Sequence, residues 1–111
     1  MTEKYLSRTE EIVLMAVWKL GEDAYGVSIR SLVQRMSGRY WSIGAVYVPL
    51  ERLEKKGLLA AEMSDPRPER GGRRKRFFRL TRSGRRELDA LFRMNAEIWR
   101  GYSAVSREEG R

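Results

Sequence analysis

The chain has 111 residues, which is enough for one domain with a modest hydrophobic core. It contains no cysteine and no histidine, so disulfides, thiol nucleophiles, imidazole catalysis and zinc sites with Cys or His ligands are excluded. Its formal net charge is +8, and residues 67–86 hold ten of its 23 lysines and arginines with only one acid, so the rest of the chain is close to neutral.

The first two helices are predicted from a cap and from apolar spacing. Ser7 and Glu10 form the pattern of a capping box, and the apolar residues that follow recur at helical spacing up to Gly21. Apolar residues at i, i+3, i+4 and i+7 over residues 29–36 predict a second, short helix.

The longest apolar run, residues 12–18, is far shorter than the roughly 20 residues that a bilayer requires, and no signal peptide is visible. We therefore expect a cytoplasmic protein.

A third helix is predicted to begin after Ser42 and to end before Gly57. Ser42 can cap it, and Trp41 can pack on Val46 as a hydrophobic staple. A helical projection gives an inward face of Ile43, Val46, Leu50 and Leu53, and an outward face of Ala45, Val48, Pro49, Arg52 and Lys56. Pro49 removes one backbone hydrogen bond and is expected to bend the helix.

A β-hairpin is predicted after the third helix. Residues 59–64 and 75–80 form its strands, and residues 65–74 contain Asp-Pro, Arg-Pro and Gly-Gly turn formers. On the second strand Phe78 and Leu80 share a face that we expect in the core, whereas Arg76 and Arg79 are predicted on opposite faces and are assigned no role. The charge of this hairpin suits the phosphate backbone of a nucleic acid, and the alternative is a solvated loop whose charge serves solubility.

A final helix is predicted after the cap residue Thr81, with apolar spacing near 3.5 that continues to Tyr102. We therefore expect a winged-helix DNA-binding domain over residues 1–80, a dimerisation helix over residues 81–104 and a frayed tail over residues 105–111. The fold class is mainly α with a small β-hairpin: a winged helix-turn-helix followed by a C-terminal dimerisation helix.

Four short motifs occur in order along the chain. They are Tyr25-Gly26; Gly44-Ala45-Val46-Tyr47 leading into Leu50-Glu51-Arg52-Leu53-Glu54-Lys55-Lys56-Gly57-Leu58; Gly71-Gly72-Arg73-Arg74-Lys75; and Leu80-Thr81-Arg82-Ser83-Gly84. Over roughly residues 10–91 the chain resembles the PadR family of bacterial transcriptional regulators. The resemblance implies a dimeric winged-helix DNA binder, usually a repressor, of the short branch in which a single C-terminal helix forms the dimer.

The candidate DNA-binding residues come from three places. They are Ser42, Gly44, Ala45, Tyr47, Val48, Arg52 and Lys56 on the third helix; Arg70, Gly71, Gly72, Arg73, Arg74 and Lys75 at the wing; and Tyr25 at the start of the second helix. Small residues on the third helix would let its backbone approach base edges, where Val48 could touch a thymine methyl group. Arg52 and Lys56 would meet phosphates, and the wing arginines could reach phosphates or a narrow minor groove.

Tyr25 and Tyr47 resemble family tyrosines that lie near DNA phosphates. Tyr25 also falls at a helix N-terminus, where backbone amides favour an anion. The alternative for each is a half-buried tyrosine that only satisfies its own hydroxyl.

The last helix carries an apolar seam for a second copy of the chain. Its members are Leu88, Leu91, Phe92, Asn95 and Trp99, of which the polar Asn95 can fix the register at some cost in stability. In branches of the family that bind flat aromatic drugs, a tryptophan of the last helix lines a slot between subunits, and Asn95 occupies the matching position here. Phe92, Trp99 and Tyr102 are candidates for a site that binds a small planar aromatic effector. The alternative is that they only close the dimer interface.

The sequence therefore predicts a homodimeric regulator, a repressor, that binds double-stranded DNA at an inverted-repeat operator. We expect no catalytic activity, no cofactor, no metal and no membrane partner. One alternative is a non-catalytic scaffold that uses the winged-helix surface to bind proteins. Another is a hydrolase with Asp or Glu and a divalent metal, for which the basic region offers no tight acidic cluster.

Overall fold

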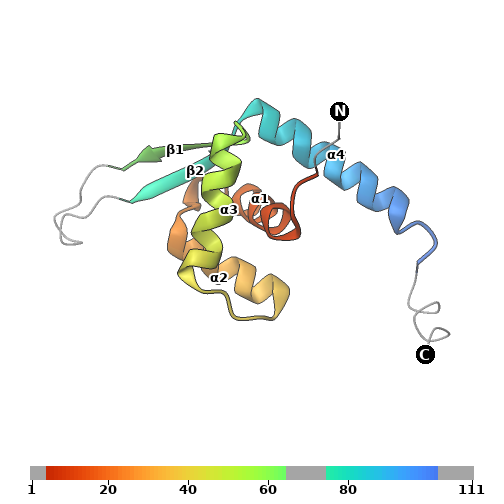
Figure 1. Cartoon of the computed structure of the whole chain (residues 1–111), viewed down its shortest axis with the longest axis horizontal. Helices are drawn as coiled ribbons and strands as arrows, with labels where there is room; N and C mark the ends of the chain where they lie inside the picture. Colours follow the sequence, from red (N-terminus) through yellow and green to blue (C-terminus); the bar gives the residue numbers. More distant parts are fainter. Residues whose placement is uncertain (1–4, 65–74, 103–111) are drawn as a thin grey trace.

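The computed structural model of the chain describes residues 5–64 and 75–102 (Figure 1). Within these residues the order of elements is α1 (Arg8–Leu20), the 3₁₀ turn η1 (Gly21–Asp23), α2 (Gly26–Ser37), α3 (Ile43–Lys55), β1 (Leu59–Met63), β2 (Arg76–Leu80) and α4 (Arg82–Ile98). The two strands form an antiparallel hairpin beside α3, and α4 runs away on the other side of the body. The predicted fold class, a mainly helical winged helix-turn-helix, is confirmed.

Three helices begin directly after the cap residues that the sequence predicts. The hydroxyl of Ser7 accepts a hydrogen bond from the Glu10 amide at 3.2 Å, and the Glu10 carboxylate accepts one from the Ser7 amide at 2.9 Å. Together these two bonds form the capping box of α1. Ser42 Oγ accepts a hydrogen bond from the Ala45 amide at 3.1 Å, and Thr81 Oγ1 accepts one from the Gly84 amide at 3.0 Å. These bonds satisfy amides that have no partner within the helix.

The turn between α2 and α3 is held by the backbone and side chain of Trp41. Its amide donates to Gln34 Oε1 at 3.0 Å, and its carbonyl accepts from Arg30 Nε at 2.7 Å. Its indole N–H donates to Ser37 Oγ at 3.1 Å while the ring is buried in the core. Trp41 thus fixes the angle at which α3 leaves α2, which sets the orientation of the helix that presents half of the candidate DNA-binding residues.

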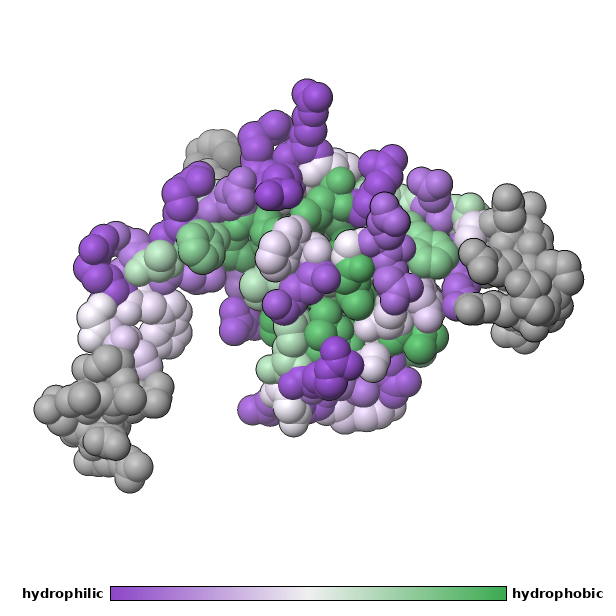
Figure 2. All heavy atoms as spheres, turned by 180° about the vertical axis from the view of Figure 1, so that it is seen from behind, coloured by the Kyte–Doolittle hydropathy of each residue, from purple (hydrophilic) through white to green (hydrophobic). Residues whose placement is uncertain are grey.

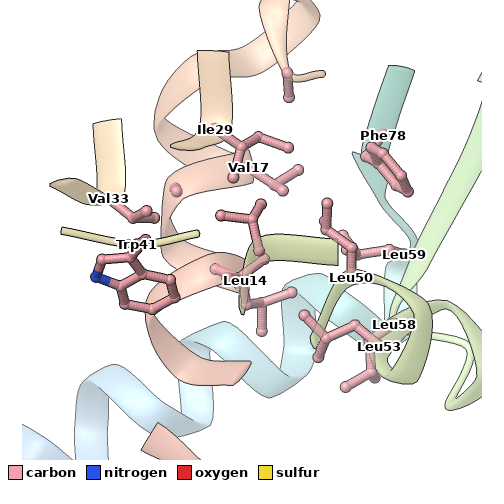
Figure 3. Packing of buried hydrophobic residues seen from close by; sticks show 14 residues of the cluster. Leu14, Val17, Ile29, Val33, Trp41, Leu50, Leu53, Leu58, Leu59 and Phe78 are labelled. Atoms are coloured by element: carbon pink, nitrogen blue, oxygen red, sulfur yellow. The ribbon is translucent and has the colours of Figure 1, made fainter. Parts of the chain in front are cut away.

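The core lies where α1, α2, α3 and the hairpin meet (Figure 3). Leu14 of α1, Ile29 of α2 and Leu50 of α3 are fully buried at its centre, and Phe78 closes it from the strand side. Phe78 and Leu80 pack on this core, as the alternation of the strand predicts. The Phe78 amide also donates to Ala24 O at 2.8 Å, so β2 is bonded to the segment before α2 as well as to β1.

The two faces of α3 differ from the projection at two residues. Ile43, predicted inward, is 47% exposed, and Pro49, predicted outward, is buried. Ile43 is the first residue of the helix, and the buried face begins only at Val46; Pro49 follows Val46 at helical spacing and joins that face. The helix continues through Pro49, and the Ala45 carbonyl that loses its amide partner belongs to an exposed residue, where water can satisfy it.

The junction between the hairpin and α4 is tightly packed. Thr81 Oγ1 donates to Gly57 O at 2.6 Å, and the Thr81 amide donates to Leu58 O at 3.1 Å. A Cβ atom at Gly84 would lie 2.0 Å from Leu58 O, so only glycine fits there. Among the described residues, no helix is long and apolar enough to cross a membrane.

Candidate nucleic-acid interface

The outward face of α3 has an uncharged half and a charged half. Its exposed residues, in order, are Ser42, Ile43, Gly44, Ala45, Val48, Glu51, Arg52, Lys55 and Lys56. In the N-terminal half these side chains are small or apolar, and the cations appear only from Arg52 onward. Such a helix can bring its N-terminal backbone close to base edges while its C-terminal end meets phosphates.

Lys56, predicted as a phosphate ligand, is engaged by a carboxylate of α1. Its Nζ lies 2.9 Å from Glu10 Oε1, and Glu10 is only 3% exposed. Burial by itself raises the pKa of Glu10, but hydrogen bonds from Lys56 and the Ser7 amide, together with the charges of Lys56 and Arg52, hold that pKa below its ordinary value. The pair ties the C-terminal end of α3 to the start of α1, and the side chain of Lys56 is still 44% exposed.

The two candidate tyrosines both lie at the N-terminus of α2. Tyr25 is the N-cap residue of that helix, and both tyrosines are half-buried. A Cβ atom at Gly26 would lie 2.1 Å from the hydroxyl oxygen of Tyr47, so this hydroxyl rests directly on the first turn of α2. Backbone amides at a helix N-terminus carry partial positive charge, so a phosphate placed here would find amides and a phenol together.

Lys75 adds a full positive charge to the same place. Its Nζ lies 4.2 Å from the centre of the Tyr25 ring, a cation–π contact, and Tyr25 in turn packs on Phe77 with ring centres 5.3 Å apart. The base of the wing and the start of α2 are thus joined through Tyr25. We call Tyr25, Gly26, Tyr47 and Lys75 the α2 cluster.

Arg76, the first residue of β2, forms an ion pair inside the domain. Arg76 NH2 lies 2.6 Å from Glu54 Oε1, which links the wing strand β2 to α3, and its guanidinium also lies over the Phe78 ring. Arg79 lies 3.8 Å from Glu62 across the hairpin, with both side chains exposed. Neither arginine was assigned to DNA, and the pair with Glu54 gives Arg76 a structural role.

The tip of the wing lies outside the described residues. Arg70, Gly71, Gly72, Arg73 and Arg74 all fall there, so their contacts with DNA stay a prediction. Lys75 is the wing candidate that the structure places.

The predicted seam of α4 divides into a covered part and an exposed part. The sequence predicted that Leu88 and Leu91 face a second copy of the chain. Instead, Leu91 is buried within the chain itself and Leu88 packs against its core. Phe92 is 75% exposed and Trp99 is 59% exposed. Trp99 is the C-cap residue of α4, and it makes an edge contact with Tyr102 at 5.2 Å between ring centres.

A groove of about 370 Å³ runs between α1 and α4. It is lined by Met15, Trp18, Arg85, Leu88, Asp89, Leu91, Phe92 and Asn95. Seen from behind, apolar surface extends over the middle of the body and along α4 (Figure 2). Trp18, which is half-exposed, was not singled out in the sequence. The signal was present, because Met15 and Trp18 are three residues apart and fall outside the buried stripe of α1.

The described part of the chain holds no group of three or more acidic side chains that could bind a metal ion. The hydrolase alternative therefore gains no support from the residues that the structure describes.

A winged helix-turn-helix that exposes its third helix beside a cationic wing belongs to the class of DNA-binding transcriptional regulators. Within that class, residues 13–90 match the transcriptional regulator PadR-like family, and the chain belongs to this family. The family predicted from the four motifs is confirmed. No curated protein matches the chain.

Solved structures share the fold. The chain is similar to a PadR family transcription regulator from Clostridium difficile R20291, with a TM-score of 0.66 and 22% identity over 95% of this chain and 100% of that one. A PadR-like regulator from Bacillus cereus matches with a TM-score of 0.64 and 19% identity over 80% of this chain and 81% of that one. BpsR of Bordetella bronchiseptica, whose DNA binding is regulated by 6-hydroxynicotinic acid, matches with a TM-score of 0.71 and 20% identity over 98% of this chain and 76% of that one. At these identities the likeness establishes the fold.

Proposed function

We propose that the protein is a homodimeric repressor that binds an inverted-repeat operator through α3, the α2 cluster and the wing. The observation that carries the proposal is that Lys75 lies over the ring of Tyr25, the N-cap residue of α2, and that the hydroxyl of Tyr47, a residue of α3, rests on the first turn of α2. A phosphate bound at the α2 cluster would fix the register of the protein on DNA and leave α3 to meet the bases.

Selection of bound sequences from a random duplex pool tests this proposal. A repressor of this kind selects two copies of one motif in inverted orientation, and its affinity falls steeply with salt because bound phosphates release counterions. A pool that shows no enrichment would contradict sequence-specific binding. Tight binding to acidic proteins with no salt-dependent binding to duplex DNA would instead favour the scaffold alternative.

The dimer is proposed from the shape and surface of α4. The C-terminal part of α4 extends away from the body (Figure 1), and the apolar side chains Phe92 and Ile98 of this helix are exposed. The α1–α4 groove offers Trp18 on the same side as Phe92, so a second α4 laid across it would cover both aromatic rings. Light scattering of the full chain tests the dimer, and a well-folded monomer would contradict it.

A small planar aromatic effector is the second part of the proposal. Trp99 and Tyr102 are in edge contact and exposed, and BpsR, a protein of similar fold, has its DNA binding regulated by an aromatic acid. The competing interpretation is that these rings only close the interface.

Titration with flat aromatic acids, followed by tryptophan emission and by operator affinity, decides between them. Because Trp18 and Trp41 also emit, Trp99→Phe is the control. An effector at this site would quench the parent more than the variant and change operator affinity, with coupling of about 1–3 kcal/mol. Quenching that is equal in parent and variant would remove Trp99 from any sensing role.

A further inference from the structure

The N-terminal half of α3 exposes two branched apolar side chains. Ile43 is 47% exposed and Val48 is 46% exposed, with only Gly44 and Ala45 as exposed residues between them. Glycine and alanine add almost nothing to the helix surface, so the two apolar side chains stand out from it. Ile43 was expected in the core. Because it is exposed, the N-terminal half of α3 exposes two branched apolar side chains, where the sequence predicted only Val48.

Apart from Glu51, whose carboxylate can accept a hydrogen bond from the amino group of cytosine, this half of the helix lacks the side chains that usually read bases by hydrogen bonds. Guanine is mostly read by Arg or Lys and adenine by Asn or Gln, and residues 42–51 contain none of these four types. Ser42 Oγ accepts the Ala45 amide as the helix cap, and Tyr47 is turned onto Gly26 of α2. Apolar contact is the main chemistry that remains for base recognition there.

The neighbouring charges keep Val48 in the groove rather than on the backbone. Glu51 lies three residues after Val48, on the same exposed side, and within the described residues it makes no ion pair. A free carboxylate beside Val48 disfavours a phosphate at that position. The cations that suit phosphates, Arg52 and Lys55, follow in the next turn.

One apolar group marks the major groove, the 5-methyl group of thymine. Ile43 and Val48 are five residues apart, about 7.5 Å along a helix axis, which corresponds to roughly two base-pair steps of 3.4 Å. We propose that Ile43 and Val48 read the methyl groups of two thymines in each operator half-site. This inference rests on the proposed function, since it concerns the N-terminal half of the same helix.

The test removes the methyl groups without changing base pairing. After the operator is selected, each thymine of a half-site is replaced singly by deoxyuridine, and dissociation constants are measured at one salt concentration. We expect a loss of about fourfold at each of two thymines, because burial of one methyl-sized group contributes about 0.8 kcal/mol. Thymines outside the motif are internal controls and should show no loss.

Variants assign each methyl group to its side chain. Val48→Ala should abolish the effect of deoxyuridine at one thymine and leave the other sensitive, and Ile43→Ala should do the reverse. Each variant is thus the matched control for the other, and both positions are exposed, so the fold is retained.

Two negative outcomes are distinguishable. A selected motif without thymines, or one insensitive to deoxyuridine at every position, would overturn methyl recognition and leave the proposed function intact. A pool without any selected motif would overturn the proposed function itself.

Discussion

At the scale of single residues, the pair of Glu10 and Lys56 shows how a buried carboxylate of α1 can hold the C-terminal end of α3. Glu10 completes the capping box of α1 with Ser7 and at the same time accepts a hydrogen bond from Lys56, which is 46 positions away in the chain. The local role of Glu10 was readable from its spacing to Ser7. The distant role was not, because no local pattern in the chain indicates which cation will reach a carboxylate from another helix.

Glu10→Gln should lower the free energy of unfolding at pH 7 by about 1–2 kcal/mol, at the low end for a charged hydrogen bond because Lys56 is partly exposed. Since the pKa of Glu10 is depressed in the folded state, this stabilisation is present above its ordinary pKa of 4.5 and is lost as the pH falls through the folded pKa. Urea unfolding of parent and variant should therefore differ at pH 7 and converge in acid. Glu51→Gln is the control, and a constant difference at all pH values would contradict the role of the ionised pair.

Gly84 is the residue on which the start of α4 depends. Gly84→Ala places a Cβ atom against the backbone carbonyl of Leu58, which cannot turn away as a flexible side chain would, so we expect a loss of about 1–3 kcal/mol. Gly44→Ala is the matched control. Its Cβ atom would meet only Ser42 Oγ at 4.0 Å on an exposed helix surface, so it should stabilise by about 0.5–1 kcal/mol. Thermal unfolding of both variants measures the difference, and equal effects would contradict the close approach.

At the scale of elements, the sequence predicts where helices begin better than where they end or which way they face; the last helix, expected over residues 81–104, ends at Ile98. The caps Ser7, Ser42 and Thr81 act within one turn, and each begins its helix as predicted. Burial depends on what lies opposite a side chain, so the exposure of Ile43 in the first turn of α3 could not be assigned from periodicity alone, whereas Pro49 lies at the boundary between the two faces and was assigned to the wrong one. The candidate site likewise depends on contacts that no local pattern predicts, because the contact of Lys75 with Tyr25 joins elements that are distant in the chain.

The α2 cluster gives a prediction about phosphate binding. Lys75→Gln should weaken binding to all duplexes and reduce the slope of log affinity against log salt by about 0.9 for each subunit, the value for one lost phosphate contact. Lys19→Gln, on the exposed surface of α1 beside Trp18, is the control and should leave the slope unchanged. An unchanged slope for Lys75→Gln would place Lys75 away from the DNA backbone.

At the scale of the whole molecule, the wing and α4 extend from opposite sides of one small core (Figure 1). Lys75 lies at the base of the wing, and the α4 side carries Phe92, Ile98 and Trp99 as exposed apolar residues. A dimer formed by α4 would leave both α3 helices and both wings free for one DNA duplex. Two-fold symmetry of the protein would then appear as an inverted repeat in the operator.

Phe92→Lys should convert the proposed dimer into a monomer, because it places a charge at the most exposed aromatic residue of α4, within the α1–α4 groove. Ala90→Lys is the control, since it adds the same charge to an exposed position of the same helix two residues away, on another face. Light scattering should give half the parent mass for Phe92→Lys and the full mass for Ala90→Lys. The monomeric variant should bind a single half-site as well as the parent does, yet lose the gain in affinity that the parent obtains from the second half-site. If both variants remained dimeric, the interface would lie away from Phe92, and the spacing of the two half-sites would have to come from another surface of the molecule.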